Sequence, residues 1–289
     1  MLKKTLLGML LAGAVSMSMA ANLSLSVYNP GAQSVFPVTS NLISGKTEVA
    51  LIDAQFQKND AQTLVAQIKA TGKTLTTVYI SHSDPDFYFG LDVIQAAFPD
   101  AKIVATAATV QAIKASSAGK MAYWGPMMGD NAPKAIVVPA VLKADYFTVD
   151  GERVEIKGLT GPNPAETYLW VPDLKTVLGG VVVYGDNVHV WLADAQTKVA
   201  RQHWRATLSG IKALKPEVVV PGHFLPGASQ TLQSVRFTDG YLATVEALLP
   251  KVQDAAGLVQ GLVRAYPDLP AGDDVTLGAK VLTGEMQWP

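Results

Sequence analysis

Residues 77–90 of the sequence, TVYISHSDPDFYFG, join an apolar strand to a run of metal-capable side chains and a glycine. His82, Asp84 and Asp86 stand at alternate positions directly after the strand. The strand gives a rigid base, and side chains on the following turn can converge on one point. A cation there would relieve the mutual repulsion of the two carboxylates. The segment therefore predicts a sheet edge that carries a polar site suited to a cation.

A second histidine follows a similar strand much later in the chain. His223 comes after the apolar run 218–220 and Pro221-Gly222, so it can lie on the same rim of a sheet as His82. Zinc is bound by imidazoles and carboxylates on rigid backbone, and a catalytic zinc keeps one position open for water. Taken alone, the same residues also fit a structural role, with hydrogen-bonded histidines at strand ends and an ordinary Asp-Pro-Asp turn.

The pattern of apolar residues predicts alternating strands and helices in two halves. The first half is predicted to contain strands at 35–38, 41–44, 48–52, 75–80 and 103–105, with helices at 60–72, 91–98 and 106–114. Residues 115–134, rich in Gly, Met, Trp and Pro, are predicted to form a long connection. The second half is predicted to contain strands at 136–138, 146–149, 153–157, 167–171, 176–178 and 218–220, with helices at 200–214 and from 241 onward.

The start of the chain has the three parts of a secretory signal peptide. Lys3-Lys4 precede an apolar stretch and the small residues that end at Ala20. We therefore expect residues 1–20 to be removed and 21–289 to form a single domain, soluble and periplasmic or secreted, with no membrane insertion. The sequence contains no Cys, so no disulfide or lipidated cysteine is expected.

Composition limits the class of partner. Hydrophobic residues make up 49% of the 289, which is enough for a sizeable core. The 23 basic and 24 acidic residues leave a formal net charge of −1, which gives no long-range attraction for nucleic acid or an anionic membrane. A small-molecule substrate is the expected partner, and the oligomeric state is left open.

Several segments resemble the metallo-β-lactamase superfamily. The loop after residue 80 is similar to the superfamily's His-x-His-x-Asp-His motif, and the strand pair containing Asn41 and Leu51-Ile52-Asp53 is similar to its entry hairpin. Further similar segments follow in the family's order, at 174–180, 187–194 and 215–223, so that the resemblance covers roughly residues 35–225. It implies an α/β fold, the four-layer αββα sandwich, with the site at one edge between two sheets.

The resemblance carries part of the family's ligand set onto this chain. His82 matches the first histidine of the motif, Asp86 its aspartate, and His223 the last histidine of the set. Asp84 stands where the second histidine belongs, and a carboxylate there can still bind a cation.

Other positions of the set have changed. Phe87 replaces the histidine after the aspartate, Pro162 falls on the third histidine, and Val181 takes the place of the bridging Asp or Cys. Glu166 and Asp186 lie near these missing positions and could replace a lost ligand. His189 is expected to fix a loop by a hydrogen bond, with contact to the pocket as the alternative. The implied site is degenerate.

Two functions remain from this reading. The first is a metal-dependent hydrolase with one divalent ion, zinc first and iron or manganese next, bound among His82, Asp84, Asp86 and His223. Asp86 would orient or deprotonate the metal's water for attack on an ester, lactone, amide or similar bond. The alternative is a non-catalytic periplasmic binding or interaction protein that has lost its metal. Its pocket walls would be aromatic, drawn from Phe87, Tyr88, Trp124 and Trp170.

Overall fold

The computed structural model describes residues 22–161, 163–269 and 272–288. The predicted signal peptide and Pro162 lie outside the described residues. Within those ranges, no helix combines the length and the apolar character that crossing a bilayer requires.

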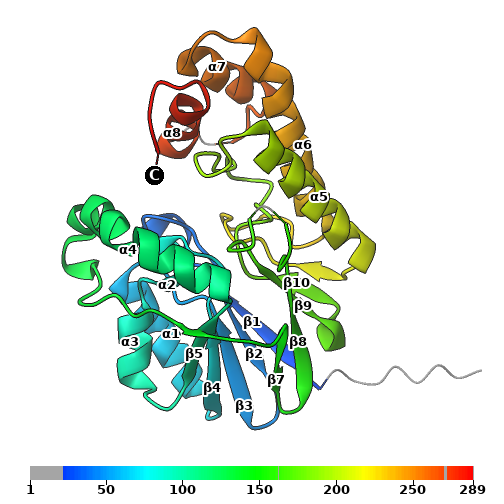
Figure 1. The fold of residues 1–289 in the computed structure, drawn as a ribbon. Coiled ribbons are helices and arrows are strands. Elements are labelled where there is room, and N and C mark those ends of the chain that lie inside the picture. The colour runs from blue at the N-terminus through cyan, green and yellow to red at the C-terminus, as the bar shows by residue number, and fades with distance from the viewer. Residues whose placement is uncertain (1–21, 162, 270–271, 289) are drawn as a thin grey trace, which may run out of the picture.

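Six strands of the described chain form the first sheet, in sequence order from β1 to β6 (Figure 1). The neighbours β1–β2 and β2–β3 are antiparallel, and the later pairs are parallel. Parallel neighbours need crossover connections, which here contain helices α1 to α4. The strands are β1 Ser24–Tyr28, β2 Ser40–Ser44, β3 Glu48–Ile52, β4 Thr74–Tyr79, β5 Lys102–Ala105 and β6 Ala140–Val141. The helices are α1 Lys58–Ala70, α2 Pro85–Tyr88, α3 Leu91–Ala97 and α4 Ala107–Met128.

The second sheet has five described strands in the order β11-β10-β9-β8-β7. Its strands are β7 Tyr146–Val149, β8 Glu152–Lys157, β9 Tyr168–Val171, β10 Thr176–Leu178 and β11 Val218–Val219. Only the pair of β10 and β11 is parallel, and their connection contains α5. The remaining helices are α5 Lys198–Leu214, α6 Leu232–Leu248, α7 Ala255–Ala265 and α8 Asp273–Leu282. Single 3-10 turns stand at Gly31–Gln33, Gly129–Asn131, Pro172–Leu174 and Leu249–Lys251.

The two sheets pack face to face with helices outside them. Strand β3 shows why, because its alternate side chains enter two different cores. Val49 and Leu51 belong to the cluster that includes the buried residues of α1 and α3, whereas Ala50 and Ile52 belong to a cluster shared with β7 to β10 of the second sheet. Burial on both faces requires a layer on each side. The expected α/β class and αββα sandwich are confirmed.

Helix α4 is the main departure from the predicted elements. The sequence predicts a helix that ends at residue 114, but α4 continues to Met128 through the segment expected to be a connection. Alanine recurs along it, which favours helix, and the buried Trp124 and Met128 anchor its last two turns. Pro126 stands inside the last turn, where loss of a single N–H bond is tolerated better than in mid-helix.

Other element boundaries also differ from the prediction. Residues 35–38 and 136–138 are irregular apart from one bridge at Val38, because the neighbouring edge positions are taken by β1 and β6. Helix α6 begins at Leu232 rather than near 241, with the Thr231 hydroxyl capping its first turn.

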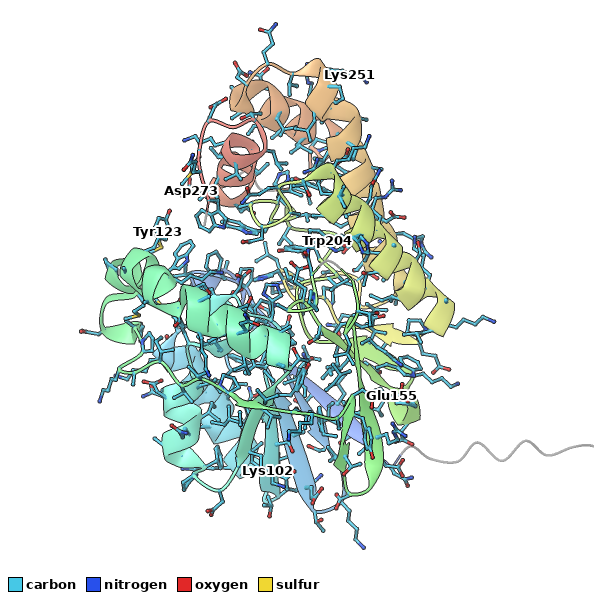
Figure 2. The ribbon with its side chains drawn as sticks, in the orientation of Figure 1. Lys102, Tyr123, Glu155, Trp204, Lys251 and Asp273 are labelled. Atoms are coloured by element: carbon cyan, nitrogen blue, oxygen red, sulfur yellow. The ribbon has the colours of Figure 1, made fainter. Side chains whose placement is uncertain are left out.

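The ends of β4 and β11 meet at one edge of the sandwich. His223, just beyond β11, forms isolated bridges with Val38 and Tyr184, which join the first half of the chain to the second. The ring of Tyr123 on α4 lies 5.8 Å from that of Trp288 near the C-terminus, and Figure 2 shows Tyr123 on the side of α4 that faces the C-terminal helices. This edge is therefore closed over by α4 and the C-terminal segment.

Candidate active site

The loop that carries His82 is held by a buried carboxylate beneath it. Asp53 Oδ1 accepts hydrogen bonds from the Ser81 N–H and hydroxyl, both at 2.8 Å, at the point where β4 ends. Burial raises the pKa of Asp53 to about 7, although the bonds from Ser81 and from the Gly180 N–H act in the opposite direction. The Ser81 carbonyl in turn accepts from Thr167 N–H at 3.0 Å, so the loop is tied to the second sheet.

His82 and Asp84 form the first of two imidazole–carboxylate pairs. The Asp84 N–H donates to His82 Nδ1 at 3.0 Å, and Asp84 Oδ2 lies 3.4 Å from the same nitrogen. His82 Nε2 is buried and has no hydrogen-bond partner among the described residues; Glu166 Oε1 lies 4.0 Å away. A small space of about 20 Å³ borders these groups together with Asp194.

Lys120 of α4 binds the other oxygen of Asp84. Its Nζ forms an ion pair with Asp84 Oδ1, and the two side chains are only 13% and 16% exposed. Burial by itself would raise the pKa of Asp84, but His82 and Lys120 outweigh it and lower the pKa. Burial likewise acts to lower the pKa of Lys120, and Asp84 and Asp194 raise it instead. The contact is therefore a charged pair.

Asp86 and His223 form the second pair. Asp86 lies in the first turn of the short helix α2, and its Oδ2 stands 3.0 Å from His223 Nε2. The His223 ring stacks on Tyr184 with centroids 5.4 Å apart, and the ring of Phe36 meets it edge-on at 6.4 Å. The contact with Asp86 is made through Nε2, so the other ring nitrogen of His223, Nδ1, lies outside the pair. The imidazole is thus fixed in orientation by the carboxylate and by two aromatic rings.

Phe87 packs against both imidazoles. Its ring centroid lies 5.3 Å from that of His82 and 5.8 Å from that of His223, and the side chain is 1% exposed. The two imidazoles therefore share contact with one phenyl ring, at the position where the family motif has another histidine.

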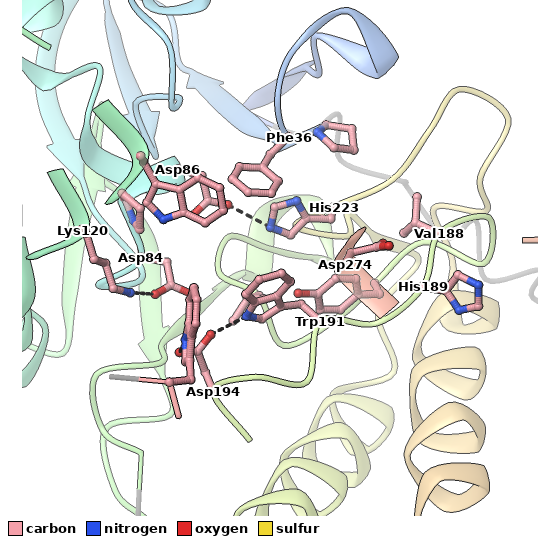
Figure 3. A pocket seen from close by; sticks show the side chains of 16 residues that line it. Phe36, Asp84, Asp86, Lys120, Val188, His189, Trp191, Asp194, His223 and Asp274 are labelled. Atoms are coloured by element: carbon pink, nitrogen blue, oxygen red, sulfur yellow. Dashed lines mark hydrogen bonds and ion pairs between the residues drawn. The ribbon is translucent and has the colours of Figure 1, made fainter. Parts of the chain in front are cut away.

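A cavity of about 100 Å³ opens beside the second pair (Figure 3). Asp84, Asp86, Lys120 and His223 line it, while His82 does not. Its other walls are mostly apolar or aromatic: Phe36, Pro37, Pro85, Trp124, Val181, Tyr184, Val188, His189, Trp191, Asp194, Asp274 and Trp288. A pocket with apolar walls and a few polar groups on one side is typical of small-molecule sites.

The residues do not fit a single ion shared by His82, Asp84 and His223. Lys120 places a positive charge on Asp84, where such an ion would have to bind, and the apolar ring of Phe87 packs against both imidazoles. In the described ranges, no three His, Cys, Asp or Glu side chains are arranged so that they could hold a metal ion. The predicted ligands lie close together in the fold, but as two separate pairs.

Of the other residues that the sequence suggested for the site, some line the cavity and others only support the surrounding loops. Trp124 and His189 reach the cavity, and His189 Nδ1 also contacts the Tyr241 hydroxyl at 2.9 Å. Asp186 instead accepts from Ser229 N–H and the Gln233 amide, at 2.9 and 2.6 Å, and so fixes a loop. Tyr88 and Trp170 are not among the residues that line the cavity.

Lys120 is the residue that sequence reasoning missed. A signal for it exists: Ile113, Lys120 and Trp124 are spaced by seven and four residues, which places them on one helix face. The face is buried at Ile113 and Trp124, so a lysine between them points toward a buried partner. The signal was hidden because residues 115–134 were predicted to be a connection.

Comparisons with known proteins agree with the fold. The family model of the metallo-beta-lactamase superfamily matches residues 34–223. None of the curated proteins matches the sequence.

Solved structures share the fold at low sequence identity. A metallo-beta-lactamase family protein from Thermus thermophilus is 18% identical, with 90% of this chain and 93% of that chain covered and a TM-score of 0.62. A beta-lactamase domain protein from Burkholderia ambifaria is 14% identical over 93% and 88%, also with a TM-score of 0.62. A metallo-beta-lactamase from Pontibacter korlensis is 18% identical over 76% and 93%, with a TM-score of 0.52.

Proposed function

Because this chain belongs to the metallo-β-lactamase superfamily, whose members are generally hydrolases, we propose that it hydrolyses a small, largely apolar ester, lactone or amide. The observation that carries the proposal is the 3.0 Å contact between Asp86 Oδ2 and His223 Nε2 at the wall of the cavity. A carboxylate beside one imidazole nitrogen favours the tautomer that carries the proton there, which leaves the other nitrogen as the proton acceptor. Asp86 and His223 thus form the water-activating pair.

The reaction follows from this arrangement. His223 Nδ1 takes a proton from a water molecule while the water oxygen bonds to the carbonyl carbon, and the carbonyl electron pair moves onto its oxygen. When that pair returns, the bond to the leaving oxygen or nitrogen breaks. The leaving group then receives the proton from His223. The Asp86 carboxylate stabilises the imidazolium in between.

Lys120 and the aromatic walls supply the remaining requirements. The ammonium of Lys120 lines the same cavity and offers positive charge to the oxyanion that forms during attack. Trp124, Trp191 and Trp288 provide apolar surface for the rest of the substrate and exclude bulk water. The substrate class is therefore a small molecule with an apolar or aromatic body.

The other expectations from sequence belong to the same proposal. The mature protein would consist of residues 21–289, act in the periplasm or outside the cell, and have a small molecule rather than nucleic acid as its partner. The metal-dependent form of the hydrolase, with zinc as the first choice, would require Lys120 to leave Asp84. Since that ion pair is largely shielded from solvent, we give the metal-independent form precedence.

A second candidate function is binding without turnover. The observation in its favour is the aromatic lining, because Phe36, Trp124, Tyr184, Trp191 and Trp288 all border one cavity. Such a pocket can hold a ligand whether or not the Asp86–His223 pair is reactive.

A substrate panel distinguishes the two candidates. Nitrophenyl esters, nitroanilides and a chromogenic lactone would be offered to the wild type and to Asp86→Asn and His223→Gln, with His203→Gln on the exposed face of α5 as the matched control. We expect turnover of at least one class, with rates about 10²- to 10⁴-fold lower in the two site variants, the usual contribution of a general base. Saturable quenching of tryptophan fluorescence without turnover would favour the binding protein. Equal rates in all four proteins would exclude the mechanism.

A further inference from the structure

We propose that Lys120 is a built-in cation that occupies, on Asp84, the place a divalent metal ion would take. The inference deepens the proposed function, because a reaction without metal needs another source of positive charge. Its test involves no substrate, so the inference and the proposed function can fail separately.

The acidic groups around the cavity create the need for a cation. Asp84, Asp86 and Asp194 line the same cavity, and Glu166 borders the adjoining small space with Asp84 and Asp194. Carboxylates gathered in a partly buried region repel one another unless positive charge is placed among them. Lys120 is the sole lysine or arginine among the described residues that line the cavity.

The Lys120 ammonium group lies where it can offset the negative charge of these carboxylates. Nζ binds Asp84 Oδ1, while Asp84 Oδ2 lies 3.4 Å from His82 Nδ1. A metal ion at Oδ1 would have to approach within about 2 Å of an oxygen that an ammonium group already contacts. The two cations therefore exclude each other at this oxygen.

Helix α4 holds Lys120 in this position. Trp124, one turn further along the helix, packs edge-on against Phe36 at 5.1 Å and against Phe56 at 6.0 Å. Helix α4 also packs against α2, the short helix that carries Asp86. The lysine stem is thus directed at Asp84 by the packing of the helix, and the charge is supplied without a free ion.

Removal of the lysine should open the carboxylates to a metal ion. Binding of zinc alone, supplied as its chloride, would be measured by calorimetry on chelator-treated full-length protein for the wild type and Lys120→Ala. Lys114→Ala, which removes an exposed lysine from the same helix, is the matched control. Lys120→Leu keeps the apolar stem and serves if the alanine variant folds poorly, and circular dichroism checks the fold.

We expect Lys120→Ala or Lys120→Leu to bind zinc at least about tenfold more tightly than the wild type and Lys114→Ala, which is a difference of about 1.4 kcal/mol. A second removal, Asp84→Asn together with Lys120→Ala, should abolish the gain. The inference is overturned if loss of Lys120 leaves zinc affinity unchanged, or if the wild type already binds one zinc as tightly as the variant.

Discussion

The two imidazole–carboxylate pairs contain the same chemical groups in different surroundings. Asp86 and His223 both border the cavity, and one ring nitrogen of His223 lies outside the pair. In the other pair, His82 does not line the cavity, Asp84 is bound to Lys120, and His82 accepts from the Asp84 backbone N–H. A histidine beside an aspartate is therefore not a function in itself. Access and the state of the second nitrogen decide whether the pair is reactive or structural.

Removal of each imidazole in turn tests most strongly whether the two pairs have different roles. His223→Ala should lower kcat by about 10²- to 10⁴-fold, because the base is lost, and should leave the fold nearly unchanged. His82→Ala should keep kcat near the wild-type value but lower the free energy of unfolding by about 1–3 kcal/mol, since the buried partner of Asp84 is lost. Kinetics on the best substrate and urea unfolding supply both readings. If His82→Ala lowered kcat and His223→Ala lowered only the free energy of unfolding, His82–Asp84 would be the reactive pair and Asp86–His223 the structural one.

The next largest expected effect is a loss of stability on truncation of Phe87. Phe87→Ala removes a fully buried ring that contacts both histidines, and such a change costs about 3–5 kcal/mol of unfolding free energy. Phe87→Leu, which keeps most of the volume, should cost much less. Urea unfolding of the two variants measures the difference. If both variants were as stable as the wild type, packing of Phe87 against the two histidines would not contribute to stability.

The aromatic wall should act on binding rather than on chemistry. Trp191 pairs edge-on with Trp288 at 5.5 Å and donates from Nε1 to Asp194 at 2.5 Å. Trp191→Leu should raise KM by about 2- to 10-fold, as expected for the loss of aromatic contacts of about 0.5–1.5 kcal/mol, with kcat little changed. Steady-state kinetics separate the two constants. A fall in kcat alone, with KM constant, would instead place Trp191 in the chemical step.

A separate prediction is a pH dependence of stability that arises from Asp53. Its pKa of about 7 in the folded protein lies above the ordinary 3.8, so the folded state keeps a proton that the unfolded chain releases between these values. The contribution to stability is therefore greatest at low pH and declines as the pH rises from about 4 to 7. Asp53→Asn, which carries no titrating proton, should flatten this decline in urea unfolding across the window. An identical pH profile in the variant would show that another group is responsible.

Much of the site's location followed from strand patterns. Apolar runs before His82 and His223 predicted that both can lie on one rim of a sheet, but β4 and β11 belong to different sheets, and their ends meet at the same edge of the sandwich instead. The sequence order of similar segments predicted the αββα fold. Local patterns suffice here because a strand's end fixes the position of the next residue to within a few ångströms.

The pairing of side chains could not be predicted in the same way. Which carboxylate faces which imidazole depends on the turn of α2, a helix of four residues, and on the volume of Phe87. Lys120 was missed because Gly119, Gly125 and Pro126 weaken the helix signal of α4, and burial of Trp124 and Met128 overrides that local preference. These pairings are set by tertiary packing and therefore cannot be read from the spacing of residues in the sequence.

We propose above that the Asp86–His223 pair activates water without a metal ion. The most direct test is turnover of the best substrate after exhaustive chelation, with the metal content of the same sample measured by mass spectrometry. We expect kcat to stay at the level of the untreated protein while bound metal falls far below one ion per chain, and His223→Ala to abolish this metal-free turnover. Loss of activity on chelation, with recovery at one equivalent of added zinc, would contradict it.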